Sequence, residues 1–239
     1  MKRIICMSFL LSFIVTYTFS GCGENDTGRQ PRNSQPQISQ AKPSGSQAED
    51  WITLFDGANF DAWQMDKLNG WVSENGAMAL KAGGSIWTKE RFGNFTLSLD
   101  FKVSPDCNSG VFFRTGSLED PVQTGIEMQV FDSVDKTNPD KHDCGALYDL
   151  QEPSTNAEKN VGEWNNVIIT CNDNLITIVM NDTKIIDIDV NTWISPNKNP
   201  DGTDNKFNTA LKDFPREGYI GFQDHGHPVW YRNVKLKKM

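Results

Sequence analysis

A glutamate and a histidine are the residues of this sequence best suited to acid–base chemistry. Glu127 lies in residues 125–131, where strand alternation places Glu127 and Gln129 on one face and the apolar residues between them on the other. His225 follows an apolar run near the C-terminus, and an imidazole can exchange a proton near neutral pH. The plainer alternatives are a solvated strand face and an exposed loop histidine.

An arginine, a tyrosine and a lysine could complete a binding site around this pair. In residues 108–114 the alternation allows Arg114 either to hold a sugar oxygen or to pair with Glu127, which would keep that carboxylate ionised. Tyr148 lies in a glycine-flanked stretch, where a half-buried strand tyrosine is the alternative. Lys89 could reach the same face, although an ordinary surface lysine is the more common case.

Short strands must position these side chains. Runs rich in β-branched and aromatic residues recur between clusters of Gly, Asn, Asp and Pro, and no stretch of 12 or more residues has a helical period. Asn181-Asp182, between two such runs, predicts a tight hairpin turn. The predicted strands are residues 71–74, 77–81, 86–88, 95–103, 110–114, 125–131, 146–149, 164–171, 175–180, 183–189, 218–223 and 229–236.

This series of strands predicts an all-β fold, with two antiparallel sheets packed face to face as a jelly-roll sandwich. One long polar segment interrupts the series at residues 190–216. Loops of that length inside a compact domain are often functional.

The N-terminus has the pattern of a lipoprotein signal. Two basic residues precede an apolar run that ends in Phe19-Ser-Gly-Cys22, which resembles a bacterial lipobox. Residues 22–49 are rich in Gln, Ser, Pro, Gly and Asn, a composition typical of a flexible tether. We therefore expect a signal peptide at 1–21, a tether at 22–49 from a lipidated Cys22, and one folded domain at 50–239.

On this interpretation the protein is exported and anchored to a bacterial membrane by its lipid alone. The outer membrane is the expected location, with the domain facing the periplasm or the cell surface. An ordinary signal peptide with an incidental cysteine is the alternative.

Three cysteines remain within the expected domain, so at most one internal disulfide can form. Cys107 and Cys144 each precede a motif in a loop, whereas Cys171 lies inside an apolar run. An oxidising compartment favours a bond, so we predict a Cys107–Cys144 disulfide and a free, buried Cys171. The absence of a Cys-x-x-Cys pair argues against a zinc site.

The composition favours a sugar ligand over nucleic acid. Thirty-one acidic residues against 23 basic ones give a net charge of −8, which opposes phosphate binding. Seven tryptophans contrast with three histidines. Trp87, Trp193 and Trp230 are candidates for stacking on sugar rings, although core packing is the usual role of tryptophan. His142 and His227 have polar, turn-like neighbours and are assigned no role.

The order of several motifs is similar to the 3-keto-disaccharide hydrolase domain family, over residues 51–239. That family's fold is similar to the concanavalin A-like lectins and glucanases, which agrees with the predicted sandwich. The motifs are Leu54-Phe-Asp-Gly57, Phe60-Asp-Ala-Trp63, Asn108-Ser-Gly-Val-Phe-Phe-Arg114, Gly125-Ile-Glu-Met-Gln-Val-Phe-Asp132, Gly145-Ala-Leu-Tyr-Asp149, Gly162-Glu-Trp-Asn165 and Gly218-Tyr-Ile-Gly-Phe-Gln-Asp-His-Gly226.

This resemblance implies an enzyme that cleaves glycosides whose sugar carries a ketone at C3. The ketone acidifies the proton on C2, so a base and an acid allow the aglycone to be eliminated before water adds. Glu127 and His225 would serve as base and acid, in either order, and both are candidate ligands of a possible divalent metal. The expected substrate-binding residues are Asn108, Arg114, Gln129, Tyr148, Gln223 and Lys89.

Two other functions are compatible with the same residues. A non-catalytic carbohydrate-binding lipoprotein would use the same fold and aromatic side chains. A conventional glucanase would need a second carboxylate along the strand, where Gln129 stands instead.

Overall fold

The computed structural model describes residues 50–64 and 70–239. The predicted signal peptide at 1–21 and the tether at 22–49, with Cys22, lie outside the described residues. Among the residues that are described, no helix is long and apolar enough to cross a membrane.

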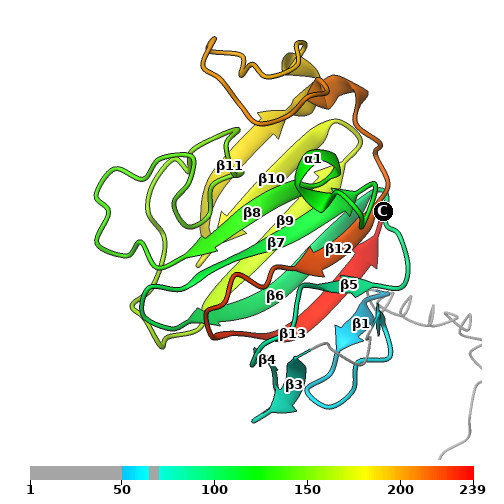
Figure 1. Cartoon of the computed structure of the whole chain (residues 1–239), viewed down its shortest axis with the longest axis vertical. Helices are drawn as coiled ribbons and strands as arrows, with labels where there is room; N and C mark the ends of the chain where they lie inside the picture. Colours follow the sequence, from blue (N-terminus) through cyan, green and yellow to red (C-terminus); the bar gives the residue numbers. More distant parts are fainter. Residues whose placement is uncertain (1–49, 65–69) are drawn as a thin grey trace, which may run out of the picture. The chain divides into compact units, whose positions relative to one another are not determined.

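Two antiparallel sheets lie one in front of the other (Figure 1). The larger sheet has eight strands in the order β11-β10-β9-β6-β13-β4-β3, with β1 also paired to β13. The smaller has five, in the order β2-β5-β12-β7-β8. The predicted all-β sandwich of two antiparallel sheets is confirmed.

The strands of the larger sheet are β1 (Ile52–Phe55), β3 (Trp71–Glu74), β4 (Ala77–Leu80), β6 (Phe95–Val103), β9 (Asn165–Asn172), β10 (Leu175–Met180), β11 (Thr183–Asp189) and β13 (Val229–Lys238). Those of the smaller sheet are β2 (Trp63–Gln64), β5 (Ile86–Thr88), β7 (Asn108–Thr115), β8 (Ile126–Phe131) and β12 (Tyr219–Phe222). Three short helical turns complete the described chain: α1 (Pro121–Thr124), η1 (Val190–Thr192) and η2 (Leu211–Asp213).

Alternating apolar residues hold the two sheets together. In β6 every second side chain, from Phe95 to Val103, is fully buried, and those between are half-buried. Phe222 of β12 stacks on Tyr231 of β13 with ring centroids 3.9 Å apart, which links the two sheets through parallel aromatic faces. One face of each sheet therefore forms the core.

Residues with positive φ explain why the hairpin turn at Asn181-Asp182 was predicted correctly and why the strand at 146–149 was not. Asn181 and Asp182 both have positive φ, 47° and 66°, as a two-residue turn between twisted strands requires. The strand predicted at 146–149 is wrong. Only Leu147 forms bridges there, and Asp149 turns the chain with a φ of 66°.

The predicted Cys107–Cys144 disulfide is also wrong, because both residues are free thiols. Each is buried in the apolar core. Burial raises the pKa of Cys107 to about 11 and that of Cys144 well above its usual value, so both are protonated thiols in the folded core. Cys171 is buried and free, as predicted.

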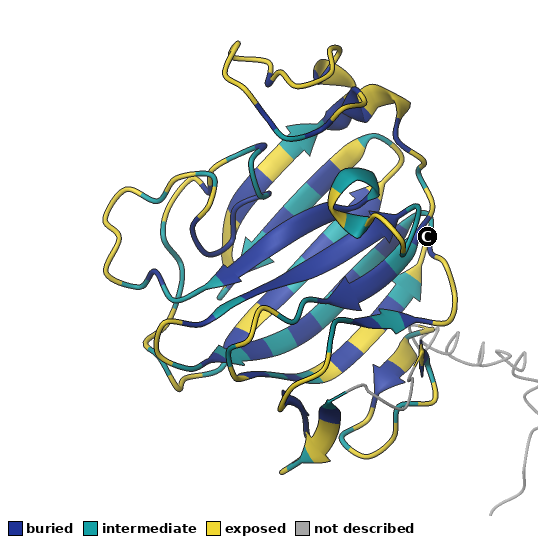
Figure 2. Ribbon diagram, viewed as in Figure 1, coloured by how far each residue is buried: buried dark blue, intermediate teal, exposed yellow. Residues whose placement is uncertain are grey.

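Strands β7 and β8 differ from the other long strands in being buried on both faces. Figure 2 shows them as continuous dark blue, whereas β6 alternates. Residues 145–148 pair with the free edge of β8: Gly145 N–H donates to Gln129 O, Ala146 O accepts from Gln129 N–H, and Tyr148 N–H donates to Glu127 O. The loop after β8 therefore extends the small sheet at this edge.

Candidate active site

A cavity of about 460 Å³ lies on the outer side of the small sheet, between β7, β8 and two long loops. One loop follows β8, and the other is the polar segment at 190–216. Strand alternation sends Ile126, Met128 and Val130 into the core and leaves Glu127 and Gln129 facing this cavity. The lining residues are Asn108, Val122, Glu127, Gln129, His142, Tyr148, Asp149, Lys206, Gln223 and His225.

Most residues proposed for the site from the sequence lie in this one cavity. They come from β7, from β8, from the segment after β12 and from the loop after β8, and are Asn108, Glu127, Gln129, Tyr148, Gln223 and His225. The arrangement supplies one carboxyl group, an imidazole, a phenol and three amides in a small volume.

Glu127 is the most perturbed acid of the cavity. It is 4% exposed, and burial raises its pKa to about 7 although the Lys206 ammonium, 3.6 Å from Oε2, opposes the rise. Near neutral pH this carboxyl group is therefore present in both protonation states, which suits proton transfer.

Gly110 provides the space for the Glu127 side chain. The two strands run side by side, with Gly110 opposite Gln129, and a Cβ at position 110 would lie 2.1 Å from Glu127 Oε1. Any larger residue at position 110 would therefore displace the carboxyl group.

We expect Gly110→Ala to lower kcat/KM on the enzyme's substrate by about 10- to 100-fold, because a displacement of about 1 Å is enough to misalign a reacting group. Gly93→Ala is the matched control, since the nearest atom to its added Cβ is 3.8 Å away. Steady-state kinetics with circular dichroism of both variants tests this. Equal kinetics for the two variants would contradict it.

Main-chain contacts fix the segment that carries Gln223 and His225. Gln223 N–H donates to Gly110 O, and Ser109 Oγ donates to Gln223 O. The Asp224 carboxylate accepts from the backbone N–H groups of Gly84 and Gly226, which holds the turn around His225. Opposite this turn Gln129 Nε2 donates to Asn108 Oδ1 at 3.3 Å.

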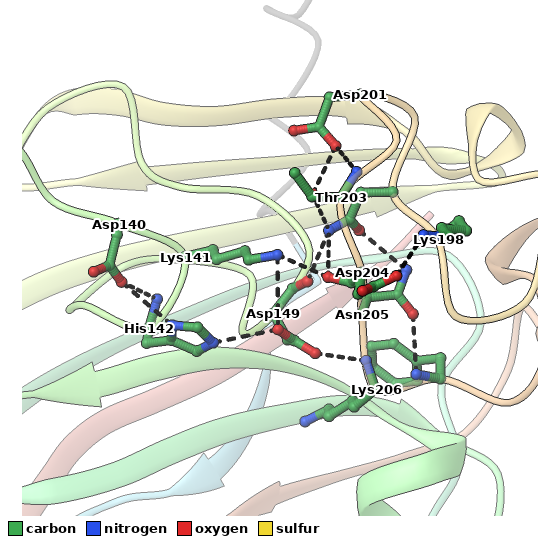
Figure 3. A network of polar contacts seen from close by, with 12 residues as sticks. Asp140, Lys141, His142, Asp149, Lys198, Asp201, Thr203, Asp204, Asn205 and Lys206 are labelled. Atoms are coloured by element: carbon green, nitrogen blue, oxygen red, sulfur yellow. Dashed lines mark hydrogen bonds and ion pairs between the residues drawn. The ribbon is translucent and has the colours of Figure 1, made fainter.

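Four lining residues were not predicted from the sequence: the apolar Val122 and the polar His142, Asp149 and Lys206. Figure 3 shows Asp149 between His142 and Lys206: His142 Nε2 lies 3.2 Å from Asp149 Oδ1, and Lys206 N–H donates to Asp149 Oδ2. The His142 ring meets Tyr148 edge-on, with centroids 4.9 Å apart. His142 and Asp149 lie in the loop after β8 and Lys206 lies in segment 190–216, so they come together only in the folded chain and no local sequence pattern indicates them. The sequence predicted a functional role only for segment 190–216 as a whole.

Arg114 does not line the cavity, which corrects its predicted binding role. It is 1% exposed, and its guanidinium donates to Gly93 O, Asp173 O and Asn94 Oδ1. The alternation fails because Arg114 has a φ of 51°, next to a register shift between β7 and β12. The alternative ion pair between Arg114 and Glu127 is not formed either, because Glu127 pairs with Lys206.

Lys89 also lies elsewhere. It follows β5, is exposed and donates from Nζ to Asp61 O, near the β2 edge of the small sheet and away from β8. Its position is that of an ordinary surface lysine.

Of the three tryptophans considered for stacking, Trp87 lies nearest to the cavity. It is half-buried against Phe112, with centroids 5.6 Å apart, and Phe112 is the β7 partner of Glu127. Trp193 is buried and donates to Asn199 Oδ1, and Trp230 belongs to the other sheet, beneath the Lys102 ammonium.

The donor set does not favour a metal centre built from protein side chains alone. Over residues 50–64 and 70–239, no group of three or more His, Cys, Asp or Glu side chains is placed to hold a metal ion. Glu127 and His225 share the cavity with His142 and Asp149, but no three of these described side chains converge as metal ligands.

The protein is therefore a β-sandwich with a polar cavity on the outer face of its smaller sheet, where amides, a phenol, carboxyl groups and imidazoles can bind and exchange protons with a polar ligand. Comparison with known proteins gives the family. The chain matches the 3-keto-alpha-glucoside-1,2-lyase-like domain over residues 50–237 and belongs to that family, so the protein is an enzyme of this type.

Individual relatives agree with this assignment. A protein of Bacteroides thetaiotaomicron named 3-keto-disaccharide hydrolase is 27% identical over an alignment of 230 residues. The alignment covers 80% of this chain and 79% of the relative. A crystal structure of a candidate glycosyl hydrolase from Parabacteroides distasonis is 31% identical, with a TM-score of 0.73 over 79% of this chain and 99% of that one. A second structure from the same organism, 24% identical with a TM-score of 0.65 over 79% and 94%, shares the fold.

Proposed function

We propose that this protein cleaves 3-keto-glycosides by elimination and hydration. A base takes the C2 proton, the C1–O bond to the aglycone breaks as C1=C2 forms, and water then adds across C1 and C2 to give the free 3-keto sugar. Water supplies a new proton to C2 and a hydroxyl group to C1, in place of the proton and the aglycone that left. The reaction therefore needs no oxidant or reductant.

The observation that carries the proposal is the buried Glu127 carboxyl group, whose pKa of about 7 matches the removal of a proton next to a ketone. We assign Glu127 as the base and His225 as the group that protonates the leaving oxygen. The amides of Asn108, Gln129 and Gln223 are suited to binding sugar hydroxyl groups. The name of the Bacteroides relative supports a disaccharide substrate oxidised at C3.

A reaction in D₂O distinguishes elimination from direct displacement at C1. With a 3-keto-glucoside as substrate, we expect deuterium at C2 of the released sugar and a transient conjugated enone. Product without deuterium, formed faster than free 3-keto-glucose exchanges that proton, would contradict elimination. Binding of an unoxidised glycan without turnover of any keto sugar would favour the non-catalytic alternative.

Export and lipid anchoring at Cys22 belong to the same proposal and depend on the sequence pattern alone. Fatty-acid labelling of the protein expressed in a bacterium tests this part.

A further inference from the structure

Among the described residues that line the cavity, Lys206 is the only Lys or Arg. Its Nζ lies 3.6 Å from Glu127 Oε2 and 4.5 Å from the centre of the Tyr148 ring, and its side chain is 18% exposed. Burial lowers the pKa of Lys206, whereas the ion pair with Glu127 and the ring face favour the charged ammonium. The cavity therefore places a half-buried ammonium next to its most perturbed acid.

The structure fixes the main chain that carries this ammonium. The Lys206 backbone N–H donates to Asp149 Oδ2, and Asn199 Nδ2 donates to Asp149 O (Figure 3 shows the surrounding network). Lys141 Nζ donates to Asp204 O, which ties the loop after β8 to the loop that carries Lys206. The anchored main chain limits the positions that the ammonium can reach, and the contacts with Glu127 and the Tyr148 ring orient the side chain.

The elimination proposed above needs a positive charge in this place. Removal of the C2 proton drives negative charge onto the C3 oxygen, which is attached to the neighbouring carbon. A base at C2 and a donor at that oxygen must therefore lie within a few ångströms of each other. Glu127 and Lys206 meet this requirement, whereas the guanidinium of Arg114 is committed to three acceptors outside the cavity.

We propose that Lys206 is the catalytic cation of the reaction, an inference that rests on the proposed function. Its ammonium donates a hydrogen bond to the C3 oxygen as the enolate forms. The C2–H bond breaks and its proton passes to the Glu127 carboxylate, while the electron pair forms C2=C3. When the enolate collapses, C3=O and C1=C2 form, the C1–O bond breaks, and the leaving oxygen takes a proton from His225. Lys206 keeps its protons throughout.

Lys206→Met and Lys206→Arg test the proposal, with Lys212→Met as the matched control. Lys212 lies in the same long segment, but its ammonium contacts only the exposed Asp213 carboxylate. On a 3-keto-glucoside we expect Lys206→Met to lower kcat by about 100- to 1000-fold with a smaller effect on KM, since the lost donor acts mainly on the transition state. Lys206→Arg should recover part of the rate, and Lys212→Met should behave as wild type.

The pH profile tests whether the Lys206 charge acts on the Glu127 carboxyl group. The Lys206 ammonium lowers the pKa of Glu127, so its loss should move the acid limb of kcat/KM to higher pH, and arginine should move it back. The loss of kcat at saturating substrate then reports the hydrogen bond to the C3 oxygen, which a lysine that only supports the fold would not supply.

The outcomes separate this inference from the function on which it rests. A wild type that releases no aglycone from 3-keto-glucosides overturns the proposed function. If the wild type releases the aglycone and Lys206→Met keeps both the rate and the acid limb of the pH profile, only the role of Lys206 is overturned. Borohydride trapping of the sugar on Lys206, seen as an added mass on its peptide, would overturn the ammonium role in favour of an imine.

Discussion

Replacing Glu127 with glutamine should lower kcat/KM for a 3-keto-glucoside by about 10²- to 10⁴-fold, the usual contribution of a positioned general base. Glutamine has almost the same shape and fits the space left by Gly110, but its amide cannot accept the C2 proton. The fold should persist, because the apolar neighbours of Glu127 along β8 still face the core. Steady-state kinetics and thermal unfolding of the purified variant measure the two effects.

The same assignment fixes the direction of the pH dependence. A base acts in its deprotonated form, and burial raises the pKa of Glu127 to about 7. Wild-type kcat/KM should therefore rise with pH up to about 7, by close to tenfold per unit on the acid side. In Glu127→Gln the residual activity should lose this limb.

Glu158 offers a matched control within the same chain. Burial raises its pKa to about 7 as well, but it accepts hydrogen bonds from Ser133 and does not line the cavity. Glu158→Gln should keep the limb per unit of folded enzyme. A limb that survives in Glu127→Gln, or one that disappears in Glu158→Gln, would contradict the assignment of Glu127 as the base.

How far the sequence predicts the site depends on whether a residue is placed by its own strand or by a distant loop. Alternation within β8 is local, so it places Glu127 and Gln129 on the outer face. The burial that raises the pKa of Glu127 depends on the folded surroundings of that face, about which alternation gives no information. Lys206 and His142 belong to the two long loops and meet Glu127 and Tyr148 only after folding.

The same distinction applies to the fold. The strand at 95–103 and the Asn181-Asp182 turn follow from neighbouring residues, and the structure contains both. The short strands β1 and β2 were missed because each depends on a partner far along the chain, β13 and β5 respectively. Alternation also assumes a regular strand, which the left-handed Arg114 is not. One residue of positive φ is therefore enough to move a predicted sugar-binding residue into the structural framework.

Arg114→Met should accordingly destabilise the protein by about 2–4 kcal/mol and leave the kinetics of the folded enzyme almost unchanged. Methionine fills much of the volume, but Gly93 O, Asp173 O and Asn94 Oδ1 each lose a charged donor in a partly buried hydrogen bond. Equilibrium urea unfolding measures the free energy of unfolding, and kcat/KM on a 3-keto-glucoside measures the site.

Arg232→Met is the comparison that makes this result specific. Arg232 pairs with Asp100 near the surface, where losing such a contact costs about 1 kcal/mol or less. Arg114→Lys should resemble Arg114→Met more than wild type, because a single ammonium lacks the fork that lets one guanidinium reach three separated acceptors. Unchanged stability together with a large loss of kcat/KM in Arg114→Met would return Arg114 to the active site. It would also mean that the three partly buried hydrogen bonds of the guanidinium do not define its main role.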